Sequence, residues 1–171
     1  MAQEIERKFL LASEDWRAAV THSQRMAQGY LTRLDGDLRA SVRVRIAADQ
    51  AWLNFKSLTL GIARLEYEYP IPLRDAEEML QQLCVDGRIE KTRHYIPQGA
   101  LTWEIDEFWG ENAGLIVAEI ELPSVDTAVE LPAWIATEVT DDPRYYNVAL
   151  AIRPYQRWGD APAFGFEVSA Q

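Results

Sequence analysis

Charged residues alternate with apolar ones near the start of the chain, in the segment E-I-E-R-K-F-L over residues 4–10. Alternate side chains of a β-strand share one face, so Glu4, Glu6 and Lys8 would project together. For one strand taken alone, the solvated face of an antiparallel sheet is the better explanation. The rest of the chain decides whether these two carboxylates and one ammonium group belong to a binding face.

The same alternation recurs in five further segments, and the opposite faces are mostly apolar. The residues that share a face are Arg43 and Arg45; Arg64, Glu66 and Glu68; Lys91 and Arg93; Glu104 and Asp106; and Glu119 and Glu121. A solvated surface would mix lysine and glutamate with serine, threonine and glutamine along each strand. The alternation therefore favours a charged interior, which would be unstable unless its charges pair or bind a ligand.

The residue types on these faces suit a phosphate chain and a divalent metal ion. Arginine binds phosphate oxygens bidentately, and lysine supplies a point charge. The predicted phosphate-binding residues are Lys8, Arg43, Arg45, Lys56, Arg64, Lys91 and Arg93. Carboxylate oxygens are the ligands that Mg²⁺ and Mn²⁺ prefer, and the predicted metal ligands are Glu4, Glu6, Glu119 and Glu121. Together these sets predict phosphoanhydride chemistry inside a charged tunnel.

Short strands must position these side chains. Strands are expected over residues 4–10, 25–34, 38–47, 51–58, 62–71, 88–96, 101–109 and 115–122, with a tight turn at L-D-G-D (34–37). Helices are expected over 13–20 with Ser13 as N-cap, over 73–83 where apolar residues have helical spacing, and over 131–139 and 144–151. The pattern predicts an α+β fold: an eight-stranded antiparallel β-barrel with flanking helices.

Composition narrows the classes of protein. The 171 residues carry a net charge of −10, which argues against binding an extended nucleic-acid backbone. The single cysteine, Cys84, cannot form an internal disulfide, which fits a reducing compartment. No apolar run approaches membrane-spanning length and no signal sequence is recognisable, so we expect a cytoplasmic protein without a membrane partner. The oligomeric state stays open.

At these residues the sequence resembles the CYTH superfamily, the triphosphate tunnel metalloenzymes. E-x-E-x-K is the N-terminal signature of that family, formed here by Glu4, Glu6 and Lys8. The likeness continues through Q-G-Y-L (28–31), V-R-V-R, F-K, R-L-E-Y-E, K-T-R, W-E-I-D-E-F, G-L-I-V-A-E-I-E-L-P and E-V-T-D-D-P-R-Y-Y-N. It covers roughly residues 3–153, and the full series in order is far more specific than the signature alone.

The resemblance implies a tunnel that binds triphosphates together with a divalent metal, in a domain over residues 1–153. The tail over 154–171 is expected to be loosely ordered. By analogy the catalytic residues are Lys8, Arg43, Arg45, Glu66, Lys91, Arg93 and Asp106, with Glu66 and Asp106 lining the tunnel. Short bacterial members with the G-L-x-V-A-E-I-E-L-P segment look most like inorganic triphosphatases.

One departure from the family pattern concerns a helix expected to plug the tunnel. Related short members carry Gly and then Lys or Arg immediately before E-V-T, where this sequence has Ala136 and Thr137. A missing cation there would lower the rate or broaden the range of substrates.

Four activities remain open from the sequence. Hydrolysis of inorganic tripolyphosphate with Mg²⁺ or Mn²⁺ is favoured, although no general base is assigned. A class IV adenylate cyclase, a thiamine triphosphatase and a non-catalytic binder of polyphosphate or nucleotides are the alternatives. His94 is expected to face outward and Cys84 to pack in the core, and the chain has no P-loop or Rossmann motif.

Overall fold

A computed structural model describes residues 3–33, 38–58 and 62–159. Its strands are β1 (Gln3–Leu11), β2 (His22–Tyr30), β3 (Ala40–Ala47), β4 (Gln50–Ser57), β5 (Ala63–Ile71), β6 (Ile89–Gln98), β7 (Leu101–Phe108), β8 (Ile116–Glu121) and β9 (Ile135–Glu138). The α-helices are α1 (Leu73–Gln82) and α2 (Asn147–Ile152), and 3₁₀ helices cover Asp15–Ala19, Gly110–Asn112, Pro143–Tyr145 and Tyr155–Arg157. The turn expected at 34–37 lies outside the described residues.

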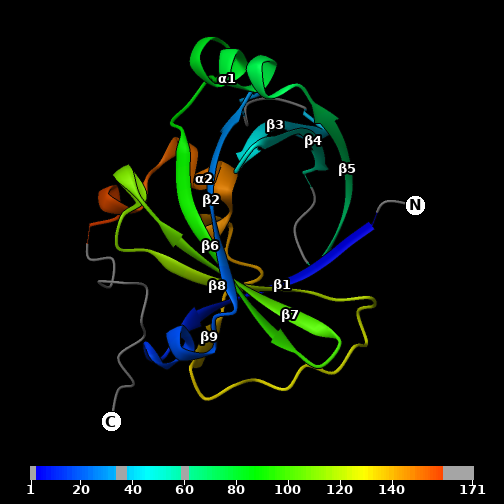
Figure 1. Cartoon of the computed structure of the whole chain (residues 1–171), viewed down its shortest axis with the longest axis vertical. Helices are drawn as coiled ribbons and strands as arrows, with labels where there is room; N and C mark the ends of the chain where they lie inside the picture. Colours follow the sequence, from blue (N-terminus) through cyan, green and yellow to red (C-terminus); the bar gives the residue numbers. More distant parts are fainter. Residues whose placement is uncertain (1–2, 34–37, 59–61, 160–171) are drawn as a thin grey trace.

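Eight of these strands close into an antiparallel barrel (Figure 1). The strand order is β5-β4-β3-β2-β6-β7-β8-β1, and a further pairing of β1 with β5 closes the ring. Strand β1 divides its pairing: Gln3–Ile5 pair with β5, whereas Glu6–Phe9 pair with β8 on the other side. The predicted eight-stranded barrel is confirmed.

The outer face of the barrel wall is mostly apolar and is largely covered by the segments around it, although Leu65, Tyr67 and Tyr69 of β5 are exposed. Trp16 and Trp103 are both fully buried there, in one cluster with Phe9 and Ile120. Helix α1 covers the outer side of β3 and β4, where Leu80 packs in a second cluster (Figure 1). The inward faces of the same strands carry the charged residues, so much of the core lies outside the barrel wall.

One end of the barrel interior is closed by apolar side chains. Leu10, Phe108 and Val117 are buried in a cluster with Leu150 of α2, although they lie on the strand faces that carry charges further along. Helix α2 contacts β2 and β6 at this end. The helix expected over 144–151 is divided into a 3₁₀ turn and α2, because Tyr146 between them has an extended backbone. Helix α2 therefore plugs the apolar end of the barrel.

The prediction of a helix over residues 131–139 is wrong, because Ile135–Glu138 form strand β9. Phe9 pairs with Glu138 and Leu11 with Ile135, along the part of β1 that β5 leaves unpaired. β-branched Ile and Thr in I-A-T-E suit a strand, and the unpaired edge of β1 offers it backbone partners. Ala136 and Thr137 thus lie in a strand outside the barrel ring and not in a plug helix.

Two smaller expectations also change. The helix expected over 13–20 is a 3₁₀ helix, Asp15–Ala19, whose N-cap is Glu14 and not Ser13. At the other end of the chain, Tyr155 is buried and its backbone N–H donates to Asn112 Oδ1 at 2.8 Å, so the first residues of the expected tail pack against the barrel. Residues 160–171 of that tail lie outside the described residues. Among the described residues, no helix is long and apolar enough to span a membrane.

Candidate functional site

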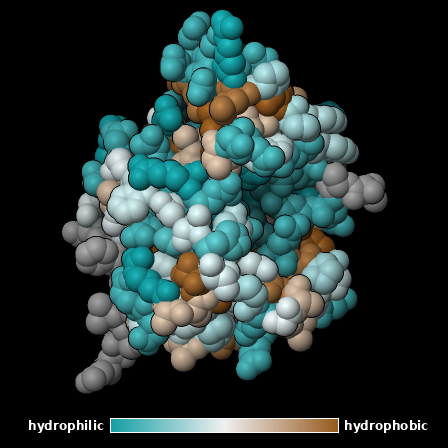
Figure 2. Space-filling view, in the orientation of Figure 1, coloured by the Kyte–Doolittle hydropathy of each residue, from teal (hydrophilic) through white to brown (hydrophobic). Residues whose placement is uncertain are grey.

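The barrel interior holds a cavity of about 380 Å³ whose walls are mostly charged. Figure 2 shows a hydrophilic hollow on the face of the molecule that it presents. The charged residues that line the cavity are Glu4, Glu6, Lys8, Arg43, Arg45, Lys56, Glu66, Glu68, Lys91, Arg93, Glu104, Glu119 and Glu121. The same-face alternation in the sequence therefore assembles one site from strands far apart in the chain.

Lys91 and Arg93 are held by Asp106, which lies behind them and does not line the cavity. Asp106 is fully buried, forms an ion pair with Lys91, and accepts from Arg93 Nε at 2.7 Å. Burial lowers the pKa of Lys91 to about 8, because desolvation of the ammonium group outweighs the attraction of Asp106. The buried carboxylate fixes two cations of neighbouring strand β6 at the cavity wall.

Lys8 connects two of the predicted metal ligands. Its Nζ lies 2.9 Å from Glu6 Oε1 and is also bonded to Glu119, whose second oxygen accepts from Arg93 at 2.7 Å. Burial alone would raise the pKa of Glu119, but Lys8 and Arg93 hold it well below its usual range. Glu119 is therefore ionised and bound on both sides by cations.

A second group of carboxyls shows mutual repulsion. Burial and then the Glu6 charge raise the pKa of Glu4 to about 7, although Lys56 lies 2.5 Å from it. Burial and Glu6 also raise the pKa of Glu121. Burial would raise the pKa of Glu6, but the combined attraction of Lys8, Lys56 and Arg64 lowers it to about 2. Glu4 also shares a hydrogen bond with Glu66, so these acids lie close together and share too few cations.

The arginines of β3 pair with the acids of β5 across the intervening strand β4. Arg43 lies 3.5 Å from Glu66, and Arg45 lies 2.7 Å from Glu68. Asn54 is buried between them and donates to both carboxylates. Asn54 was not among the predicted site residues, although its position between Trp52 and Lys56 in the alternation of β4 would have placed it on the inner face.

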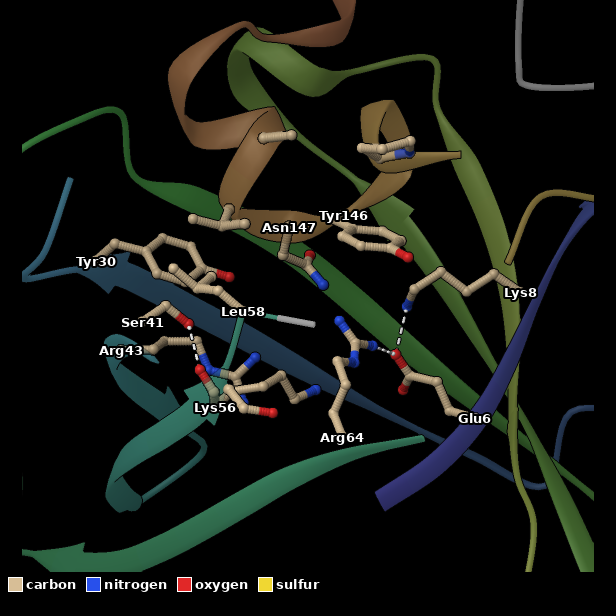
Figure 3. A pocket seen from close by; sticks show the side chains of 14 residues that line it. Glu6, Lys8, Tyr30, Ser41, Arg43, Lys56, Leu58, Arg64, Tyr146 and Asn147 are labelled. Atoms are coloured by element: carbon tan, nitrogen blue, oxygen red, sulfur yellow. Dashed lines mark hydrogen bonds and ion pairs between the residues drawn. The ribbon is translucent and has the colours of Figure 1, made fainter. Parts of the chain in front are cut away.

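A smaller cavity of about 180 Å³ adjoins the first at its apolar end (Figure 3). Arg64 lines this cavity, with its Nη2 2.6 Å from Glu6 Oε1, and not the larger one. Tyr30, Tyr146 and Asn147 also line it and were missed as site residues. The segments Q-G-Y-L and R-Y-Y-N, which were singled out only for their family resemblance, were the signal that could have found them.

The side chains on the outer face have structural partners. His94 lies outside the barrel, where its Nε2 is 3.1 Å from Glu107 and its Nδ1 is 2.7 Å from Ser23 Oγ. This is the outward position that strand alternation predicts. Trp52, by contrast, lines the cavity, where the Arg45 guanidinium lies over its ring.

Comparisons with known proteins give this barrel its family. The CYTH domain family model matches residues 2–146. The chain belongs to the CYTH family. A protein of Acetivibrio thermocellus named inorganic triphosphatase is 44% identical to this CYTH protein over 161 residues, which is 92% of this chain and 99% of that protein. A second inorganic triphosphatase, from Nitrosomonas europaea, is 37% identical over 153 residues, or 87% of this chain and 97% of that protein.

The fold of this CYTH protein also matches solved structures. The crystal structure of an inorganic triphosphatase superposes with a TM-score of 0.65 at 33% sequence identity, covering 89% of this chain and 96% of that chain. The matched part includes most of the barrel, so the tunnel architecture is shared.

The four predicted metal ligands of this CYTH barrel lie around one cavity but do not form a ready-made cluster. Across residues 3–33, 38–58 and 62–159, no group of three Asp, Glu, His or Cys side chains has metal-binding geometry. Glu4, Glu6 and Glu119 are ion-paired with lysine or arginine. Glu121 pairs across the strands with Glu6 in the β1–β8 register. The chemistry of the donors still fits a hard divalent cation, which prefers carboxylate oxygens and would relieve the repulsion among them.

Proposed function

We propose that this protein is a hydrolase that cleaves a phosphoanhydride bond of inorganic tripolyphosphate inside its barrel. The observation that carries the proposal is the cavity of about 380 Å³, where cations from several strands of a closed barrel converge. The names of the two relatives, both inorganic triphosphatases, support the same activity.

In this proposal the phosphate chain binds by exchanging ionic partners. The proposed phosphate-binding residues are Lys8, Arg43, Arg45, Lys56, Arg64, Lys91 and Arg93. Each of them now lies within ion-pair distance of a carboxylate. A triphosphate carries several anionic oxygens in a row, so it can replace many of these contacts at once. Arginine provides the bidentate contacts and lysine the point charges.

A divalent metal ion, Mg²⁺ or Mn²⁺, belongs to the proposal. Glu4, Glu6, Glu119 and Glu121 would hold it, because they supply the carboxylate oxygens on one side of the cavity. The raised pKa values of Glu4 and Glu121 support this assignment, since both reflect burial and repulsion from Glu6 that a cation would relieve. When bound, the ion would neutralise phosphate charge and polarise the bond to be broken.

The protein's own side chains would stabilise the charge that develops as the phosphoanhydride bond breaks. Asp106 already orients Arg93 and Lys91, so they can donate hydrogen bonds to the leaving phosphate once the phosphate chain has replaced the contacts of Arg93 to Glu104 and Glu119. Glu66 plays a corresponding role for Arg43 and Lys56, which lie 3.5 and 3.8 Å from it. Asp106 and Glu66 are then positioning residues, and the cations touch the substrate.

The proposed partner is a small anionic molecule in the cytoplasm. The net charge of −10 leaves few cations on the surface for a nucleic acid, whereas the cations inside the barrel are concentrated within reach of a short chain of phosphates.

A phosphate-release assay tests the proposal. The purified protein is incubated with tripolyphosphate, ATP or thiamine triphosphate and either Mg²⁺ or Mn²⁺, with EDTA as the control. Phosphate release from tripolyphosphate that EDTA abolishes is the expected result. No release from any of the three would contradict hydrolysis. Chromatography of the ATP reaction separates the alternative, since a cyclase would form cyclic AMP and pyrophosphate and not ADP and phosphate.

A further inference from the structure

The larger and smaller cavities meet at a small set of shared residues. Four of these are charged, and the fifth is Asn147, the first residue of α2. The charged ones are Glu6, Lys8, Arg43 and Lys56. Asn147 is therefore the one neutral side chain at the boundary between the two spaces, within the part of the chain that the structure describes.

The two spaces on either side of Asn147 differ in chemistry. Beyond it, the smaller cavity has an apolar wall formed by Tyr30, Leu58, Tyr146 and Val148 (Figure 3). The larger cavity is walled mainly by charged side chains. Phosphate groups suit the larger space, whereas the organic substituent of a triphosphate ester would suit the apolar one.

Hydrogen bonds hold the backbone around Asn147, whereas its side-chain oxygen has no partner among the described residues. Tyr146 Oη donates to Thr140 O at 2.9 Å, and Leu150 N donates to Tyr146 O at 3.0 Å, which holds the start of α2 in place. The Oδ1 atom of Asn147 is buried and has no hydrogen-bond partner among the described residues. In Figure 3 the amide points into the space between Tyr30 and Arg64. The Oδ1 atom cannot itself bind a phosphate, because both are acceptors, but without a donor it does not hold the amide in one orientation. The nitrogen end of the amide faces the open space in Figure 3, where it could donate to a bound anion.

We infer that Asn147 determines specificity by marking the end of the phosphate-binding space. Its amide nitrogen donates a hydrogen bond to the terminal phosphate of an inorganic chain, and its bulk separates that phosphate from the apolar cavity. An organic triphosphate must push its substituent past this amide, so it binds less well. The inference rests on the proposed triphosphatase activity and deepens it by naming what selects inorganic substrates.

The two substrates depend on Asn147 in opposite ways: tripolyphosphate gains a hydrogen bond from it, whereas ATP is obstructed by it. Lys8 and Arg43 already supply positive charge at this boundary. The Asn147 amide adds a neutral hydrogen-bond donor for the terminal phosphate, and using it breaks no ion pair. Replacing Asn147 by alanine removes the donor and joins the two cavities. ATP then reaches the wall formed by Tyr30 and Leu58 with its adenosine, while its phosphates stay among the cations.

The test compares Asn147→Ala with Gln24→Ala, using tripolyphosphate and ATP as substrates. Gln24 carries an amide that lines the larger cavity but not the smaller one, which makes it a matched control. Loss of one hydrogen bond to a charged group should lower kcat/KM for tripolyphosphate about tenfold in the Asn147 variant. The ratio of kcat/KM for ATP to that for tripolyphosphate should rise by at least about tenfold there, and by less than about twofold in Gln24→Ala.

Two further variants of Asn147 test the roles of its amide donor and of its bulk separately. Asn147→Asp has nearly the same shape but no amide donor and carries a negative charge, so it should impair both substrates, mainly through KM. Asn147→Ser is a second way to open the boundary if the alanine variant does not fold, and it should shift the ratio in the same direction. Thermal unfolding of each variant reports whether the fold is intact.

The outcomes separate the inference from the proposed function. A wild-type protein without phosphate release would overturn the triphosphatase proposal itself. An active wild type whose Asn147→Ala or Asn147→Ser variant loses both activities by the same factor would mean a structural role, and would overturn the inference alone. A ratio that moves towards tripolyphosphate would overturn it as well.

Discussion

The two faces of the barrel wall are built from the same strands and do opposite things. In β7, Trp103 and Ile105 point outward into the core, whereas Asp106 points inward and holds two cations. The outer face gains free energy from burial, while the inner face spends part of it on concentrating charge. Folding therefore depends mainly on the outer side chains and chemistry on the inner ones, although the two kinds alternate along each strand.

Replacing an inner arginine should have the largest effect on activity. Arg93→Ala removes the contacts of Arg93 to Asp106, Glu104 and Glu119. It also removes a proposed bidentate contact to phosphate, which consists of two charged hydrogen bonds. We expect kcat/KM for tripolyphosphate to fall by at least about a hundredfold, as loss of more than one charged hydrogen bond implies. Arg43→Ala should be similarly severe.

The matched control for Arg93 is an arginine on the outer face. Arg7 of β1 is bonded to Glu138 through both Nε and Nη2, but it points away from the cavity. Arg7→Ala should keep the activity within about threefold, because an exposed pair contributes only about 1 kcal/mol or less to stability. Equal losses of activity in the two variants would break the distinction between the faces.

Tryptophans on the two faces give the reverse comparison, with stability as the readout. Trp103 is fully buried on the outer face and packs edge-on against Phe9 and Trp134, so Trp103→Ala should destabilise the protein by about 3–5 kcal/mol. Trp52 lines the cavity and is only partly buried, so Trp52→Ala should cost markedly less. Urea unfolding followed by circular dichroism measures both, and a Trp52 cost equal to that of Trp103 would contradict the assignment of the core to the outer face.

Two neighbouring inner glutamates should differ in the sign of a smaller effect on stability. The folded-state pKa of Glu4 is raised to about 7, so Glu4 costs stability as the pH rises above its unfolded value. The pKa of Glu6 is lowered to about 2, so Glu6 contributes stability that is lost only as the pH falls towards 2. At pH 8 in EDTA, Glu4→Gln should stabilise the protein and Glu6→Gln destabilise it, each by about 1–3 kcal/mol.

Both glutamate variants should lose most of their metal-dependent activity, since both residues are proposed ligands. Thermal unfolding in EDTA and phosphate release across a metal titration are the two measurements. Stability changes of the same sign would contradict the contrast between Glu4 and Glu6. Wild-type activity with unchanged metal dependence would remove both from the proposed ligand set.

The sequence predicted the barrel and its inner face well, because strand alternation is a local property. Lys8, Arg43 and Lys91 could be placed on one face from their spacing alone. Strand β9 could not, since Ile135–Glu138 are extended only because β1 leaves part of its edge unpaired by β5. Likewise, nothing local shows that Asp106 lies behind the cavity wall or that Tyr30 and Asn147 meet beside it.

Steady-state kinetics on tripolyphosphate, ATP and pyrophosphate test whether the barrel selects a chain of three phosphates. Cations from several strands should bind a chain of three phosphates best, and losing one phosphate should cost about tenfold or more in kcat/KM. The expectation is that tripolyphosphate is hydrolysed with a higher kcat/KM than ATP and that pyrophosphate is a poor substrate. A kcat/KM for ATP equal to or above that for tripolyphosphate would contradict it.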